Sequence, residues 1–93
     1  MKKWLDCTIS PGQFTGEFAV QGSLFDGTGF SLFADKDDLK FNGEPTFDNP
    51  IKGFIQVVHL DKQGNLSLVA LPRPTFEKGQ IITVKADMVK EKV

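Results

Sequence analysis

The chain has one cysteine and one histidine, the two side chains best suited to nucleophilic catalysis. Cys7 and His59 could act as nucleophile and general base if the fold brought them within hydrogen-bond reach. Cys7, however, lies on the apolar face of an alternating segment, where a free cysteine behaves as a small hydrophobic residue. His59 lies between two apolar residues of a predicted strand. We therefore interpret Cys7 as a buried, inert thiol and His59 as a structural strand residue.

Two aspartates offer a second possible chemistry, because Asp35 and Asp87 each follow an alanine at the end of an alternating segment. Two carboxylates brought together can have separated pKa values and work as acid and base. Neither aspartate is followed by the small residue and glycine of aspartic protease sites, and aspartate commonly caps a helical turn. We interpret both as capping residues, which leaves an enzyme using this pair as a remote alternative.

Metal and cofactor sites are not indicated by the sequence. One cysteine and one histidine cannot supply the three or four nitrogen and sulfur ligands of a zinc site. The acidic turn containing Asp35, Asp37 and Asp38 lacks the glycine and distal glutamate of an EF-hand loop. The glycines between 22 and 29 are not followed by the Lys-Ser or Lys-Thr of a phosphate-binding loop. We predict no catalytic residue, no metal and no cofactor.

Nucleic-acid binding is the main alternative to protein binding. An OB-like barrel that binds single strands needs exposed aromatic residues beside a basic groove. The sequence offers few cations for this purpose, since 11 basic and 12 acidic residues give a net charge of −1. Phosphate neutralisation supplies most non-specific affinity, so nucleic acid is the weaker alternative. The candidate residues are Phe33, Phe76, Arg73, Lys78 and Lys85.

The length of 93 residues favours a single domain spanning 1–93 with one hydrophobic core. Asp6 interrupts the apolar run that a signal peptide would need after Lys2 and Lys3, and no segment approaches the roughly 20 apolar residues of a membrane span. A lone cysteine suits a reducing compartment. We therefore expect a cytoplasmic protein without a membrane partner.

The elements that must carry these residues are strands, because glycine or proline interrupts nearly every window long enough for a helix. Apolar residues alternate in 4–9, 17–21, 30–34, 66–70 and 82–86, and the continuous apolar run 51–60 fits a strand at the centre of a barrel or buried on both faces. Short helical turns are expected at Asp35 and Asp87, and 41–50 is expected to be a linker. The predicted core comprises Leu5, Phe18, Val20, Phe30, Leu32, Ile55, Val57, Leu66, Leu68, Ile82 and Val84.

The two halves of the chain, 1–43 and 51–93, share an order of features that suggests an internal repeat. In this alignment Leu32 corresponds to Val84, and Asp35 corresponds to Asp87. Two three-stranded meanders would then form a six-stranded antiparallel barrel with pseudo-twofold symmetry and no exposed sheet edges. Without duplication, a five-stranded SH3-like or OB-like barrel is expected. Either way the fold class is all-β with one or two short helical turns.

The expected function is that of a non-catalytic binding or assembly module whose partner is another protein. Alternation places several phenylalanines in the core but leaves other aromatic residues in turn-rich segments. Aromatic residues and arginine are enriched at the centres of protein interfaces, so these loop residues are the candidate binding site. Plugging of the barrel ends is their alternative role. The candidates are Phe25, Phe47, Pro72, Arg73, Pro74 and Phe76.

Overall fold

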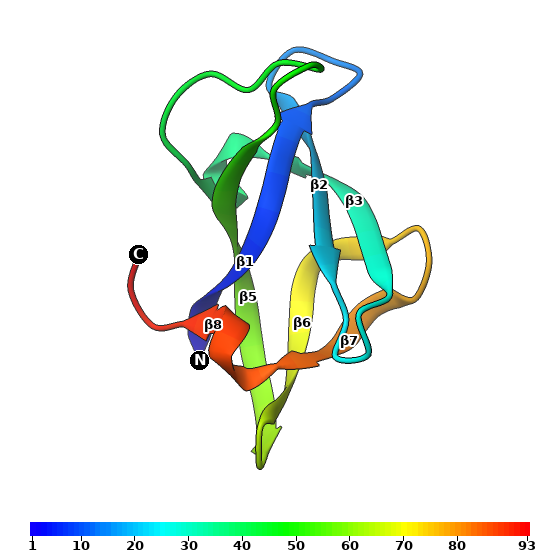
Figure 1. Ribbon diagram of the computed structural model, residues 1–93, viewed down its shortest axis with the longest axis vertical. Coiled ribbons are helices and arrows are strands. Elements are labelled where there is room, and N and C mark those ends of the chain that lie inside the picture. Colours follow the sequence, from blue (N-terminus) through cyan, green and yellow to red (C-terminus); the bar gives the residue numbers. More distant parts are fainter.

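The computed structural model describes residues 1–93 as one antiparallel sheet that curls into a half-barrel (Figure 1). The all-β class, the antiparallel pairing and the short helical turns are as the sequence predicts, and the expected barrel is open on one side. The structure adds two strands of two residues each, β4 and β8. The elements in chain order are β1 (Lys2–Pro11), β2 (Glu17–Ser23), β3 (Gly29–Asp35), the 3-10 turn η1 (Lys36–Asp38), β4 (Leu39–Lys40), β5 (Ile51–Gln63), β6 (Leu66–Thr75), β7 (Gly79–Lys85), the 3-10 turn η2 (Ala86–Met88) and β8 (Val89–Lys90).

The sheet is built around the long central pair β1 and β5, and its strand order is β3-β2-β1-β5-β6-β7. Leu5 of β1 faces Ile55 of β5 in the antiparallel register. The two short strands cross between the halves, because β4 pairs with β5 and β8 pairs with β1. Each half of the chain therefore ends by hydrogen bonding to the central strand of the other half.

Both halves have the same order of elements: a long strand, two further strands, a 3-10 turn and a two-residue strand. Gly29 begins β3 and Gly79 begins β7, fifty residues later. The same spacing relates Leu32, which pairs with Val20, to Ile82, which pairs with Val69. We call residues related in this way equivalent. A common origin of the halves by duplication stays a prediction.

The residue matching predicted for the two halves is wrong. The structure makes Leu32 equivalent to Ile82 and not to Val84, a difference of two residues. The sequence alignment was anchored on two Ala-Asp pairs that occupy different places. Asp35 is the last residue of β3, whereas Asp87 lies within η2. Hydrogen-bond register, which a single sequence does not display, decides the match.

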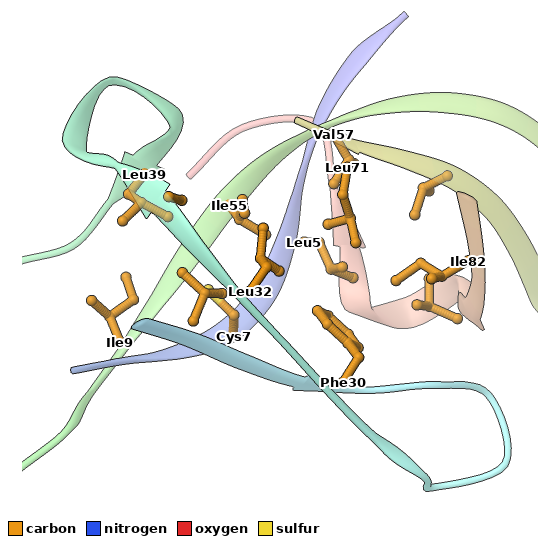
Figure 2. Packing of buried hydrophobic residues seen from close by; sticks show 14 of the residues in the cluster. Leu5, Cys7, Ile9, Phe30, Leu32, Leu39, Ile55, Val57, Leu71 and Ile82 are labelled. Atoms are coloured by element: carbon orange, nitrogen blue, oxygen red, sulfur yellow. The ribbon is translucent and has the colours of Figure 1, made fainter. Parts of the chain in front are cut away.

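The core fills the concave side of the half-barrel, where strands of both halves contribute apolar side chains (Figure 2). Most of the predicted core is confirmed. Phe18 is half-buried and packs against this cluster, with its ring edge-on to Phe41 at a centroid distance of 5.2 Å. The predicted residues that are buried are Leu5, Val20, Phe30, Leu32, Ile55, Val57, Ile82 and Val84.

The prediction for β6 is wrong, because its inner face carries Ser67, Val69 and Leu71 instead of Leu66 and Leu68. Nearly every residue from 66 to 71 is apolar, so alternation cannot choose between the two faces. A register shift between His59 and Asp61 further changes how β5 meets β6. The buried Ser67 hydroxyl is satisfied by the His59 ring, at 3.3 Å between Oγ and Nε2.

Of the two alternatives expected for 51–60, the structure has the central strand. The strand β5 lies at the centre of the sheet, as predicted. It is not buried on both faces, since Val58 and Leu60 are exposed. The segment 41–50 contains no strand, which agrees with the predicted linker.

Candidate binding surfaces

The turn between β6 and β7 lies along the free edge of β3. The Phe76 backbone N–H donates to the Ser31 carbonyl oxygen at 2.9 Å. The Ser31 backbone N–H and hydroxyl donate to the two carboxylate oxygens of Glu77, at 2.8 and 2.7 Å. These hydrogen bonds from Ser31 lower the pKa of Glu77. We call this arrangement the β3 edge contact, and it covers an edge strand that would otherwise be open to pairing.

Side chains extend the β3 edge contact along the strand. Arg73 Nη2 donates to Asp35 Oδ2 at 2.8 Å, and the Phe76 ring packs edge-on against Phe33 with centroids 5.5 Å apart. Asp35 makes no capping hydrogen bond to η1, and η2 is preceded by Lys85 and not by Asp87. The predicted capping roles of both aspartates are therefore wrong. Arg73 and Asp35 are both well exposed, so their ion pair contributes little stability.

A reciprocal hydrogen bond joins the other hairpin turn to β7. The Phe25 backbone N–H donates to the Thr83 carbonyl oxygen at 3.0 Å, just as Phe76 donates to Ser31 in β3. Each hairpin turn thus binds the return strand of the other half. The Phe25 ring lines a small hollow of about 190 Å³ beside Ile81. The backbones of Phe25 and Phe76 therefore hold the half-barrel together, while their rings stay 46% and 69% exposed.

The six predicted site residues do not form one patch. Pro72, Arg73, Pro74 and Phe76 follow one another at the β3 edge contact. Phe47 is 77% exposed but lies in the green 41–50 segment, which Figure 1 places away from the β6–β7 turn. The Arg73 guanidinium already has an intramolecular partner, the carboxylate of Asp35.

A surface that the sequence did not predict lies on the outer side of β5, β6 and β7. Val58, Ala70 and Ile81 form one cross-strand row, since Ala70 pairs with both of the others. Val58 is 40% and Ile81 is 56% exposed. Leu68 extends the row along β6, where its partner in β5 is the exposed Asp61, and Leu60 lies at the register shift of β5 between His59 and Asp61. Leu60 and Leu68 are 47% and 36% exposed. We call these five residues the apolar outer face.

The equivalent surface of the N-terminal half is polar. There the cross-strand row consists of Thr8, Gln21 and Ser31, because Gln21 pairs with both of the others. The two rows occupy equivalent places in the same curled sheet. Polar residues are therefore accommodated at these positions, and the fold does not require apolar ones there. The C-terminal half has Val, Ala and Ile at the positions where the N-terminal half has Thr, Gln and Ser. The sequence reasoning missed this face because it assigned Leu68 to the core.

The residues with catalytic potential each have their own surroundings in the structure. Burial raises the pKa of the Cys7 thiol to about 12, which keeps it in the poorly nucleophilic protonated form. His59 contacts Ser67, Asp35 contacts Arg73, and the Asp87 carbonyl oxygen accepts from Lys90 Nζ at 2.7 Å. No three histidine, cysteine, aspartate or glutamate side chains cluster in a way that could hold a metal ion.

None of the family models, curated proteins or solved structures compared with the chain matches it. No helix in the structure combines the length and the apolar character that crossing a membrane would require.

Proposed function

We propose that this chain is a non-catalytic protein-binding module, and that it binds through the apolar outer face. The observation that supports the proposal is the contrast between the two equivalent rows. The row of Val58, Ala70 and Ile81 is apolar where Thr8 and Gln21 show that polar residues fit the same backbone. Apolar residues scattered singly over a surface are common, whereas a contiguous patch of exposed apolar residues often marks an interaction site.

The partner that fits this face best is a second copy of the chain. The central row of Val58, Ala70 and Ile81 carries no charge, so it can pack against the same row of a second copy without charge pairing, and the exposed Asp61 beside Leu68 lies at its border. A twofold axis places the same patch of both copies in contact, which is the commonest arrangement of homodimers. The net charge of −1 gives the two copies little reason to repel each other. Two such sheets would pack face to face about 10 Å apart.

The size of the face implies a weak, concentration-dependent dimer. Complete burial of a Val, Leu or Ile side chain is worth about 1.5–3 kcal/mol, and the exposed fractions of Val58, Leu60, Leu68 and Ile81 leave roughly half of that to be gained. Association costs offset much of the gain. Pro72 follows Ala70 by two residues in β6, so Pro72 and the residues after it, Arg73, Pro74 and Phe76, would form the rim. Phe25, which borders Ile81, would form the opposite rim, and Phe47 takes no part.

Sedimentation velocity over a concentration series tests the proposal. A binding free energy of about −4 kcal/mol corresponds to a dissociation constant of about 1 mM. The wild-type chain is therefore expected to shift from monomer to dimer as its concentration approaches about 1 mM. Ala70→Lys places a charge at the centre of the face and should abolish the shift. Gln21→Lys places the same side chain at the equivalent position of the polar half and should leave the shift unchanged.

Two results would overturn the proposal. A wild-type chain that remains monomeric over the whole series lacks the self-association that the face predicts. Equal effects of Ala70→Lys and Gln21→Lys would show that added charge, and not the location, reduces association. Circular dichroism of both variants confirms that each retains the wild-type fold before the comparison is made.

A further inference from the structure

A hollow of about 560 Å³ lies between η1, β4 and β5, next to the C-terminal residue. In Figure 1 this is the region where the teal and green segments of η1 and β4 approach β5. Three lysines from three elements line it: Lys36 of η1, Lys40 of β4 and Lys52 of β5. Its apolar lining includes the half-buried rings of Phe41 and Phe54. The remaining lining residues are Asp37, Leu39, Asn42, Gly53 and Val93.

The antiparallel pairing of β4 with β5 places these lysines around one hollow. Lys40 pairs with Phe54, so the lysine and the aromatic ring are direct cross-strand neighbours. The close approach requires a glycine at position 53, because a Cβ there would lie 2.8 Å from the Lys40 carbonyl oxygen. The linker 41–50 separates Lys36 and Lys40 from Lys52 in the sequence. The pairing of β4 with β5 nevertheless places all three lysines in the lining of one hollow.

The positive charge of the hollow is not neutralised by ion pairs. The two ion pairs of the structure join Lys3 to Glu91 and Arg73 to Asp35, and neither involves a lysine of the hollow. Asp37 is the one acidic side chain in the lining, against three lysines. Lys40 Nζ also lies 4.8 Å from the centre of the Trp4 ring, where the cation is attracted to the aromatic face.

We propose that this hollow binds a nucleoside phosphate, which combines an anionic phosphate with an aromatic base. The lysine ammonium groups would contact the phosphate, and the rings of Phe54 and Phe41 would contact the base, since bases stack on aromatic side chains whatever their sequence. The volume lies within the roughly 300–1,000 Å³ of small-molecule sites. The phosphate-bearing nucleoside is either a free nucleotide or part of a single strand. No residue of the hollow belongs to the apolar outer face, so this inference does not depend on the proposed function.

NMR titration of the ¹⁵N-labelled chain with adenosine monophosphate tests the inference. The largest shifts are expected at the amides of Lys40, Phe41, Gly53 and Phe54, together with the indole N–H of Trp4, which reports on Lys40. Parallel titrations use inorganic phosphate, adenosine and a short oligothymidylate. The monophosphate should bind more tightly than phosphate or adenosine alone. Tighter, salt-dependent binding of the oligothymidylate would assign the site to single strands, and equal or weaker binding would assign it to free nucleotides.

Substitutions locate the interaction. Lys52→Gln should weaken binding of the monophosphate about three- to tenfold, the range expected for loss of one exposed charged contact. Lys62→Gln, which removes an exposed lysine from the end of β5 outside the hollow, should have no effect. Equal effects of the two substitutions, shifts spread over the whole surface, or phosphate binding as tightly as the monophosphate would each overturn the inference.

Discussion

Leu71 and Leu68 allow the assignment of the two faces of β6 to be tested with one kind of substitution. Leu71 is 2% exposed and belongs to the core, whereas Leu68 is 36% exposed on the outer side of the same strand. Leu71→Ala should therefore lower the free energy of unfolding by about 2–4 kcal/mol, because it removes buried methyl groups and leaves a cavity. Leu68→Ala should lower it by less than about 1 kcal/mol, as expected for a side chain that stays partly in water.

Thermal and chemical denaturation followed by circular dichroism measure both effects. For a domain of this size, 1 kcal/mol corresponds to about 4–8 °C in the melting temperature, so Leu71→Ala should melt at least about 8 °C below the wild type. Leu68→Ala should melt within a few degrees of it. Dimerisation should show the opposite order, because Leu68 lies on the apolar outer face and Leu71 does not. Equal destabilisation by the two variants, or a greater loss for Leu68→Ala, would refute the assignment of faces.

Two further expectations concern titrating groups. Burial raises the pKa of Cys7 from 9.0 to about 12, so folded-state stability should fall as pH rises from 9.0 towards 12, and a Cys7→Ala variant should lose this alkaline dependence in denaturant titrations. The same burial should hold maleimide labelling of native Cys7 far below the rate in denaturant, and rapid native labelling would contradict the buried thiol. Hydrogen bonds from Ser31 lower the pKa of Glu77 below 4.5, so this contact stabilises the fold above that pH and is lost as pH falls through the lower folded value. Glu77→Gln should therefore melt with a weaker acid dependence than the wild type, whereas an unchanged acid profile would show that the β3 edge contact is not maintained in solution.

The sequence by itself determined the class of fold and most of the core. In the first strand and in the strands around Leu32 and Val84, every second residue is apolar on one side. Burying that side is the dominant free-energy gain, so the buried side of each strand follows from the alternation. The glycines and prolines of 41–50 excluded a central strand there. The exclusion of helices followed from the same two residue types.

Only the tertiary structure decided what lies on the outside. In β6 both faces are apolar, so the choice between Leu68 and Leu71 depends on its register with β5 and on the shift near His59. Aspartate is a common capping residue, but the carboxylate of Asp35 binds an arginine 38 residues away. Lys40 and Lys52 line the same hollow because β4 pairs with the central strand of the other half. Alternation records which side of a strand faces the core, whereas contacts between distant segments depend on strand pairing, which local sequence patterns do not encode.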